Sequence, residues 1–478
     1  MNAKAISIHA HFYQPPREDP LTNEIPVEPG AAPYPNWNEK IYDQCYHPNA
    51  EQGNFRKISF NIGPTLNNWL EDVHPEILEK IIHQEQENYE KFGVGNAMAQ
   101  AYNHTILPLS SRDDKETQVR WGIDEFVCRF GHRPQGMWLP EAAVDLETLE
   151  VLVENGIEFV ILAPWQADKV DVDVSQPYLV ELSGGKKITA FFYDQDLSMR
   201  VSFDPAATVN ADEFVLDYVL PKFNGNHTSR PRLHIVASDG ELYGHHQPFR
   251  EKFLAYLLNG AVGKQDIENV YPGLWLKRHP ATESIRILEN TSWSCPHGVS
   301  RWKEACDCAA HGEWKAPLRK AFDQIASVLD REYLSFVGKY LENPWEMRHR
   351  YSQVLCGKTE PAAYIRSMIS QKLPDEDVQT IELLLSAQYE RQRMFTSCGW
   401  FFDDFDRIEP RNNIAYAAQA VWLTELASGI DLSEQALKWL KPVKSWRSGL
   451  RGDQVFRFRL EKTKEAWQQI SMRQLPTV

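Results

Sequence analysis

The sequence has no apolar run long enough to cross a membrane, and no apolar stretch follows its first residues. A membrane-spanning helix needs about 20 predominantly apolar residues, and a secretory signal needs an apolar core close to the start of the chain. Because both features are missing, we expect a cytoplasmic protein without a membrane partner.

Cysteine is scarce, since seven residues, an odd number, are scattered over 478 positions. Such a pattern does not form a disulfide framework. Cys306 and Cys308 make a C-x-C pair with Cys295 upstream, but the C-x2-C pairing and the fourth ligand of a usual zinc site are not evident. We therefore expect packed thiols at these positions and at Cys398, and neither a metal site nor another cofactor.

Basic residues are outnumbered, at 51 against 66 acidic residues, and the formal charge is −15. This charge argues against nucleic acid or an anionic membrane as the main partner, and a neutral substrate fits better.

Aromatic residues, by contrast, make up 12% of the chain and include 15 Trp. Aromatic rings grip the apolar faces of sugars or bases, although a large core rich in Trp would have the same composition.

The chain exceeds the size of a single core, so we expect two domains. Strand and helix patterns alternate in its first part. Residues 4–12 alternate in polarity, and residues 157–163 and 233–237 are apolar runs, as expected for strands. Residues 75–92 and 113–130 have helical periodicity. This order is typical of a barrel or a doubly wound sheet of parallel strands.

Three segments depart from this alternation. Residues 178–193 predict a β-hairpin, and the proline-rich residues 13–50 predict a long loop without regular structure. Helical patterns dominate the last third of the chain. We expect a barrel-type domain at residues 1–310 and a helical domain at residues 311–478, with an aromatic loop near residues 397–404.

Two carboxylates stand at the ends of predicted strands. Glu141 lies between an apolar run that ends at Pro140 and a helical pattern that begins near Leu146, and Asp239 comes just after the run 233–237. In a barrel of alternating strands and helices, this end of the strands carries the chemistry. Glu141 alone could instead cap the next helix. The interpretation therefore depends on whether the two carboxylates converge.

A pair of carboxylates with histidine and aromatic residues nearby is what glycoside cleavage requires: one attacks or stabilises the anomeric carbon and the other donates a proton to the leaving oxygen. If the two carboxyl groups lie about 5 Å apart, the reaction retains the configuration, and if they lie about 6.5 to 9.5 Å apart, it inverts the configuration. Spacing in the sequence does not decide between these outcomes. Burial of Asp239 and the charge of Glu141 would raise the pKa of the aspartate. A cationic His9, His11 or His104 would favour the ionised nucleophile or hydrogen-bond sugar hydroxyls.

Four motifs follow one another along the first half of the chain: H-A-H-F-Y-Q-P from His9, A-Y-N-H-T-I-L-P-L from Ala101, G-M-W-L-P-E from Gly136 and S-D-G-E-L-Y-G-H-H from Ser238. In this order and at these intervals they resemble the successive conserved regions of glycoside hydrolase family 57. The later segments T-S-W-S-C-P-H-G-V-S-R-W and S-C-G-W-F-F-D-D are similar to a branch of that family with a C-terminal domain of unknown function.

The resemblance implies an α/β fold, namely an incomplete (β/α)7 barrel followed by a mostly α-helical C-terminal domain. It also implies a retaining glycoside hydrolase or transglycosylase that acts on α-glucans without a metal, with Glu141 as nucleophile and Asp239 as acid/base. Trp138 could instead be part of the barrel wall, and Glu241 could orient the acid/base. The expected substrate-binding residues are His9, His11, Gln14, His104, Trp138, Trp165, Glu241, His245, Trp293, Trp302 and Trp400.

Two other functions are compatible with the sequence. His9 and His11 form an H-x-H pair, which suits zinc in deacetylases and some α-mannosidases, and the pair His245-His246 beside Asp239 could complete the site of a metal-dependent carbohydrate hydrolase. Alternatively, the chain is a glucan-binding protein without catalytic activity on the same fold.

Overall fold

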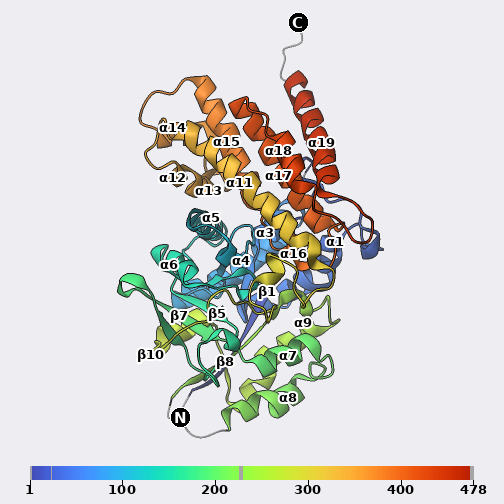
Figure 1. Cartoon of the computed structure of the whole chain (residues 1–478). Coiled ribbons are helices and arrows are strands. Elements are labelled where there is room, and N and C mark those ends of the chain that lie inside the picture. The colour runs from blue at the N-terminus through green and yellow to red at the C-terminus, as the bar shows by residue number, and fades with distance from the viewer. Residues whose placement is uncertain (1–2, 23, 225–229, 474–478) are drawn as a thin grey trace. The chain divides into compact units, whose positions relative to one another are not determined.

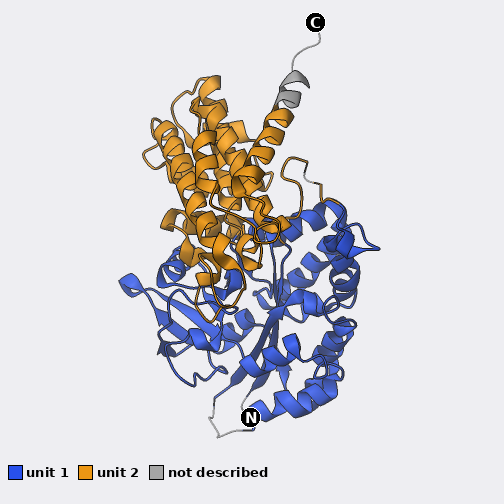
Figure 2. Ribbon diagram, turned by 45° about the vertical axis from the view of Figure 1, so that its right-hand side comes forward, with its two compact units in different colours: residues 1–14, 27–101, 125–294 blue, residues 15–26, 102–124, 295–478 orange. Residues whose placement is uncertain are grey.

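The computed structural model describes residues 3–22, 24–224 and 230–473. The chain forms two compact units, which Figure 2 shows in blue and orange. Unit 1 comprises residues 1–14, 27–101 and 125–294, and unit 2 comprises residues 15–26, 102–124 and 295–478. Among the described residues, no helix has both the length and the apolar character needed to cross a bilayer.

The central strand of unit 1 is β1 (Lys4–Phe12), which has the predicted bounds and is buried on both faces. It pairs in parallel with β2 (Ser59–Ile62), β8 (Arg232–Asp239) and β9 (Glu268–Asn269), as Figure 1 shows in part. Burial on both faces is typical of parallel strands that are covered by helices. The register of β1 and β8 confirms the prediction that these strands belong to a parallel sheet.

The other strands form shorter pairs. β3 (Ala99–Gln100) runs parallel to β4 (Met137–Trp138), and β5 (Phe159–Leu162) runs parallel to β7 (Lys187–Phe192). β6 (Tyr178–Glu181) is antiparallel to β7, which confirms the predicted hairpin.

Single backbone contacts link these pairs to one another. Two isolated parallel bridges connect β2 to β3 and β4 to β5, through Phe60 with Ala97 and Gly136 with Phe159. Beyond β7, the amide of Asp194 donates a hydrogen bond of 2.7 Å to the carbonyl of Ile235 in β8. From β1 through β2, β3, β4 and β5 to β7, parallel neighbours thus follow the order of the sequence, and β8 lies on the other side of β1.

Helices follow most of these strands. α4 (Pro75–Phe92) has the predicted bounds, because proline suits the first turn of a helix and Gly93, with φ of 65°, ends it. The other helices that lie wholly in unit 1, together with its last strand, are α1 (Trp37–Ile41), α2 (His47–Glu51), α3 (Pro64–Val73), α6 (Leu146–Glu154), α7 (Gln195–Phe203), α8 (Ala211–Phe214), α9 (Arg250–Tyr256), α10 (Pro272–Arg278) and β10 (Glu283–Ile285). α5 (Arg112–Phe130) has residues in both units.

The prediction that residues 13–50 lack regular structure is wrong for their last third. α1 and α2 are joined by a π-helical turn at Tyr42–Tyr46, so that residues 37–51 are helical throughout. Asn36 caps the start of this segment, because its side chain accepts a hydrogen bond of 2.9 Å from the amide of Glu39. Most of the prolines precede this cap, which leaves the helix free to form.

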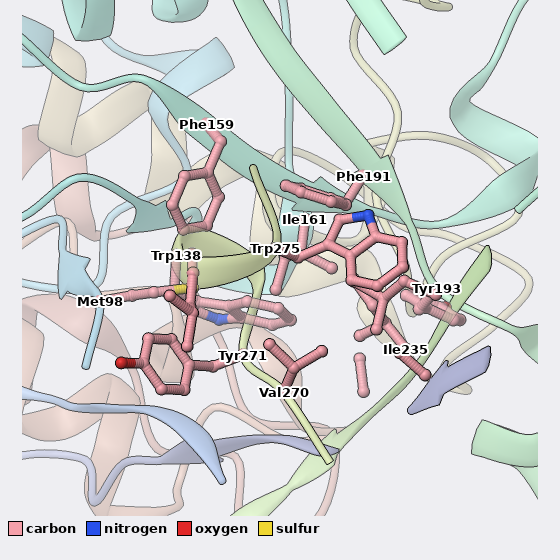
Figure 3. Close-up of a cluster of buried hydrophobic side chains, with 14 of the residues drawn as sticks. Met98, Trp138, Phe159, Ile161, Phe191, Tyr193, Ile235, Val270, Tyr271 and Trp275 are labelled. Atoms are coloured by element: carbon pink, nitrogen blue, oxygen red, sulfur yellow. The ribbon is translucent and has the colours of Figure 1, made fainter. Parts of the chain in front are cut away.

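Figure 3 shows an apolar cluster of unit 1, in which aromatic rings from several strands and from α10 meet. Trp138 and Trp275 have almost no exposed surface. The ring of Phe159 stands edge-on to that of Phe191, with centroids 5.6 Å apart. A Cβ at Gly136 would lie 2.4 Å from the Phe159 ring, so this packing requires glycine. Burial of such large side chains is a main source of stability, at about 25 cal/mol per Å² of apolar surface.

Unit 2 contains the predicted C-terminal helices. They are α11 (Lys315–Val337), α12 (Pro344–His349), α13 (Ser352–Leu355), α14 (Pro361–Met368), α15 (Asp375–Arg393), α16 (Cys398–Phe401), α17 (Ile408–Ser428), α18 (Ser433–Leu440) and α19 (Gly452–Arg473). The aromatic segment at residues 397–404, which was expected to be a loop, includes the short helix α16.

A buried group of ions joins three of these helices to α5. Asp114 lies 3.0 Å from a guanidinium nitrogen of Arg348 and 2.8 Å from one of Arg391, and Asp330 lies 2.8 Å from Arg391. Burial raises the pKa of Asp114, but the charges of Arg391 and Arg348 outweigh it and hold the pKa well below its usual range. The aspartate is therefore ionised and paired inside unit 2.

Candidate active site

Glu141 lies in a strained turn directly after β4. Its backbone has φ of 58° and ψ of 20°, and Ala142 follows with φ of 48°. Residues other than glycine rarely adopt this left-handed region, and such strain concentrates at functional sites. The turn is held by the amide of Trp293, which donates a hydrogen bond of 2.9 Å to the carbonyl of Glu141.

The carboxylate of Glu141 is oriented by two consecutive residues. Its Oε2 accepts hydrogen bonds from Nε1 of Trp293 over 3.0 Å and from Oγ of Ser294 over 2.6 Å. Hydrogen bonds to a charged acceptor are shorter and stronger than neutral ones, so both donors stabilise negative charge on this oxygen.

Asp239 is the last residue of β8, and part of its side chain is open to solvent. The protein around it nevertheless removes much of its hydration. This burial, together with the negative charge of Glu141, raises the pKa of Asp239 to about 7. The two predicted causes of the shift are thus confirmed, and the carboxyl group holds a proton over part of the physiological range. The negative charge of Glu141 thus acts on Asp239.

Glu241 adds a third carboxyl group to this region. Burial and then the charge of Asp239 raise the pKa of Glu241 to about 8. Its Oε1 accepts hydrogen bonds from the hydroxyl of Tyr46 over 2.8 Å and from the amide of Tyr13 over 3.2 Å. Gln14, expected to bind substrate, donates from Nε2 to the same hydroxyl over 3.0 Å. Gln14 and Tyr46 are both buried, so they support Glu241 from within the protein.

A row of polar side chains crosses the ends of three parallel strands next to Asp239. The register pairs His11 with Asp239 of β8 on one side and with Asn61 of β2 on the other. The Nδ2 of Asn61 lies 2.9 Å from Nδ1 of His11 and donates to Oε1 of Gln100, in β3, over 2.7 Å. Nδ1 of His9 in turn lies 3.0 Å from Oγ of Ser59.

His9 and His11 are uncharged near neutral pH. Burial, and then the proximity of His11, lowers the pKa of His9 to about 3, and burial lowers the pKa of His11 to about 4. The expectation of a cationic imidazole at these positions is therefore wrong, because the site removes the water that would stabilise the charge. The other expected role, a hydrogen bond from one of these histidines to a sugar hydroxyl, is compatible with the neutral imidazole.

Potential metal ligands converge elsewhere. Within the described ranges, three or more such side chains meet only at Cys295, His297, Cys306 and Cys308, in unit 2. His9 and His11 are not part of this set. His297 supplies a fourth potential ligand, which was not evident in the sequence, beside the three cysteines.

Aromatic side chains surround the Glu141 turn. Trp293 stands edge-on to Trp138, with ring centroids 5.0 Å apart, and lies 6.4 Å from Tyr193. Trp165 stands edge-on to Tyr193 at 5.9 Å, and its Nε1 donates to the carbonyl of Ser292 over 3.0 Å. Trp165 is 39% exposed and can offer a ring face to a ligand.

Two of the residues expected to bind substrate are instead fully buried. Trp138 and His9 have no accessible surface, and their rings stack on each other with centroids 4.7 Å apart. The expected direct contact with substrate is corrected for both, because they pack inside unit 1. For Trp138 this burial agrees with the alternative role as part of the barrel wall.

His245, also expected to bind substrate, is half-buried, and its Nδ1 lies 2.7 Å from Oε1 of Gln44. Burial and then the proximity of His246 lower the pKa of His245 to about 4.

The other expected site residues, His104, Trp302 and Trp400, belong to unit 2. His104 has φ of 53°, and its Nδ1 lies 2.6 Å from Oγ of Ser397. Trp400 is almost completely buried and stands edge-on to Phe322, with centroids 5.7 Å apart. Trp302 is also almost completely buried.

Four residues of the site were missed from the sequence. Asn61 had a local signal, since it is a polar residue in an apolar strand, and Ser294 directly follows a tryptophan that was singled out. Tyr46 and Tyr193 had no distinguishing signal, because their contacts are with residues far away in the chain.

Comparison with known proteins identifies two regions of the chain. Residues 8–287 match the model of a family described as glycosyl hydrolase family 57, and residues 311–474 match a domain of unknown function, DUF3536. An α-amylase of Pyrococcus furiosus is 24% identical over 212 residues, which cover 43% of this chain and 30% of that protein. Alpha-amylase 1 of Dictyoglomus thermophilum is 28% identical over 214 residues, 43% of this chain and 29% of that protein. The matches thus span less than a third of these relatives.

Solved structures show a similar fold. An exo-type maltose-forming amylase from Pyrococcus sp. ST04 has a TM-score of 0.73 at 15% identity, over 91% of this chain and 82% of that chain. A branching enzyme from Thermococcus kodakaraensis has a TM-score of 0.60 at 14% identity, over 97% of this chain and 94% of that chain. At this level of identity the likeness concerns the fold alone.

Proposed function

The chain belongs to glycoside hydrolase family 57, and we propose that it is a retaining α-glucan hydrolase or transglycosylase with Glu141 as nucleophile and Asp239 as acid/base. The observation that carries this proposal is electrostatic. Glu141 accepts two hydrogen bonds that stabilise its charge, and that charge, added to burial, raises the pKa of Asp239 to about 7. In this mechanism one carboxyl group is ionised and attacks, while the other keeps its proton and donates it. The two groups therefore need different environments.

In the proposed reaction the carboxylate of Glu141 attacks the anomeric carbon, and the bond from that carbon to the leaving oxygen breaks as Asp239 donates its proton to the oxygen. The product is a glycosyl ester on Glu141. Asp239, now ionised, takes a proton from water or from a sugar hydroxyl, whose oxygen attacks the same carbon and releases Glu141. Water gives hydrolysis, and a sugar acceptor gives transfer.

We also propose that unit 1 forms the incomplete (β/α)7 barrel implied by the family. The series of parallel contacts β8-β1-β2-β3-β4-β5-β7 supports it, as does the hydrogen bond from Asp194 back to Ile235 in β8. We further propose a catalytic domain at residues 1–310 and a helical domain at residues 311–478. The family matches over residues 8–287 and 311–474 support this division.

The substrate is proposed to be an α-1,4-linked glucan, because the curated relatives are named α-amylase and 4-α-glucanotransferase. Trp165 is the candidate for stacking on a sugar ring, since it keeps exposed aromatic surface next to the site. His11, neutral and next to Asp239 in the strand register, is the candidate for a hydrogen bond to a sugar hydroxyl.

The test is product analysis after incubation with maltooligosaccharides and amylose. Shorter chains alone mean hydrolysis, redistributed lengths mean disproportionation, and new α-1,6 links mean branching. Glu141→Gln should abolish each of these, whereas the control Glu213→Gln, at an exposed position of α8, should leave them unchanged. The first product should keep the α configuration at the anomeric carbon by proton NMR. Inversion of configuration, or full activity of Glu141→Gln, would overturn the mechanism. If the unmutated protein binds amylose but converts no α-glucan, the result would favour the alternative of a glucan-binding protein without catalytic activity.

A further inference from the structure

Two tight turns in unit 2 bring three cysteines and a histidine together. The first turn is C-P-H-G, in which the amide of Gly298 donates to the carbonyl of Cys295 over 3.1 Å and Gly298 has φ of 76°. The second is C-D-C-A, in which the amide of Ala309 donates to the carbonyl of Cys306 over 2.9 Å. Each turn presents two potential ligands in the pattern C-x-H or C-x-C.

The four ligand atoms form a compact group. The sulfur atoms of Cys295, Cys306 and Cys308 are separated by 3.6, 3.4 and 3.0 Å, and Nδ1 of His297 lies 3.2 Å from the sulfur of Cys306. All four atoms lie within 4.8 Å of one another. They come from turns that are close in sequence, so the group is a local feature of unit 2.

This geometry fits a single tetrahedral ion. A Zn–S bond of about 2.3 Å places the sulfur atoms of a tetrahedral site about 3.8 Å apart, and each ligand atom here would move outward by only about 0.3 Å to reach that distance. A cluster of several irons would hold the thiolates on different metal atoms and therefore farther apart. Three thiolates and one imidazole are a ligand set that zinc prefers, and four protein ligands leave no open position for catalysis.

The surroundings favour a negatively charged site. Zn²⁺ with three thiolates carries one net negative charge. Nε of Arg301 donates to the sulfur of Cys308 over 3.2 Å, and another nitrogen of the same guanidinium donates to the carbonyl of Cys308 over 3.0 Å. The ammonium group of Lys315 is buried, has no hydrogen-bond partner among the described residues and is within electrostatic range of the three cysteines. Donors and cations of this kind orient thiolate ligands and balance their charge.

We propose that Cys295, His297, Cys306 and Cys308 bind one structural zinc ion. The ion ties the two turns together before α11 begins, in a stretch of residues 295–314 that has only short helical turns. The first ligand directly follows Ser294 in the sequence, so the site is also adjacent along the chain to a residue that orients Glu141.

The first test is the metal content of the whole unmutated protein, purified under reducing conditions without chelators and measured by mass spectrometry of the elements. About one zinc per chain is expected. After replacement by Co²⁺, the absorption spectrum should show the visible bands of a tetrahedral site and the near-ultraviolet bands of thiolate ligands. A folded protein that contains no zinc and does not take up Co²⁺ with these bands would overturn the proposal, as would iron with acid-labile sulfide or a disulfide between any two of the three cysteines.

Variants separate a metal role from a packing role. His297 is exposed, so His297→Ala should leave the fold intact but weaken zinc binding by more than about tenfold, whereas His297→Cys should keep the metal in a four-thiolate site. Cys306→Ser with Cys308→Ser should lose the metal. The control Cys128→Ser, at an exposed free cysteine, should retain one zinc per chain. Equal zinc affinity in His297→Ala and the unmutated protein would show that His297 is not a ligand and overturn the four-ligand site. None of these measurements depends on glycoside hydrolysis.

Discussion

The hydroxyl of Ser294 donates a hydrogen bond of 2.6 Å to Oε2 of Glu141, across 153 positions of the sequence. The oxygen that receives it also accepts the indole N–H of Trp293, so two consecutive residues define the orientation of one carboxylate. If Glu141 is the nucleophile, these donors fix the direction from which its carboxylate meets the substrate.

Ser294→Ala should lower kcat by a factor between about 10 and 100 and change KM little. A hydrogen bond to a charged group contributes about 1.5 to 3 kcal/mol, and here it orients the nucleophile and does not hold substrate. The measurement is steady-state kinetics on a maltooligosaccharide. Ser294→Thr, which keeps the hydroxyl, should recover most of kcat, and the exposed Ser284→Ala serves as a control. An unchanged kcat in Ser294→Ala would mean that Ser294 does not position Glu141.

Activity should fall as the pH rises through about 7. Asp239 donates a proton only in its protonated form, which is the form present below its pKa of about 7. The pH profile of kcat/KM should therefore have its alkaline limb near that value. A limb above pH 9 would assign the proton donor to another group.

The same pKa should decrease in Glu141→Gln, because the charge that contributes to the shift of Asp239 is removed while burial remains. Infrared difference spectra of the carboxyl band, with Asp239→Asn to assign it, would measure this. No decrease would mean that the two carboxyl groups do not interact.

Glu241→Gln should stabilise the protein at alkaline pH. In the folded protein the pKa of Glu241 is raised to about 8, so between about pH 4.5 and 8 the folded state holds a proton that the unfolded state has lost. The free energy of unfolding of the unmutated protein falls as the pH rises through this window, and glutamine does not titrate. The difference should reach a few kcal/mol at pH 8 and vanish near pH 4.

Calorimetry of both proteins at pH 5 and pH 8 would measure this difference. Glutamine can accept the hydrogen bonds of Tyr46 and Tyr13 in the same way as the protonated acid, so the comparison isolates the charge. A variant that loses stability equally at both pH values would contradict the proposed cause.

Arg391→Met should destabilise unit 2 by about 3 kcal/mol. It removes one of two cations that pair with buried Asp114, and an incompletely paired buried charge is strongly destabilising. Arg348 stays in contact with the aspartate, which limits the loss. The measurement is the thermal unfolding temperature, with Arg366→Met, a half-exposed arginine paired with exposed Asp375, as control. Equal effects of the two substitutions would refute a special role for the buried group.

Local patterns determined much of the fold. The strand β1 and the helix α4 have the bounds that periodicity predicts, because this signal acts within one element. The positions of Glu141 and Asp239 at strand ends were also visible in the sequence. The helical segment at residues 37–51 was not predicted, because the prolines that precede it made the whole of residues 13–50 resemble a loop.

Tertiary structure alone decided the environment of these residues. The low pKa values of His9 and His11 come from burial, which no local pattern reveals, and the support of Glu241 by Tyr46 joins residues 195 positions apart. His297 becomes a candidate ligand only when the two turns meet. Sequence thus determines where a side chain stands in its own element, whereas its charge, exposure and partners depend on contacts between elements that only folding brings together.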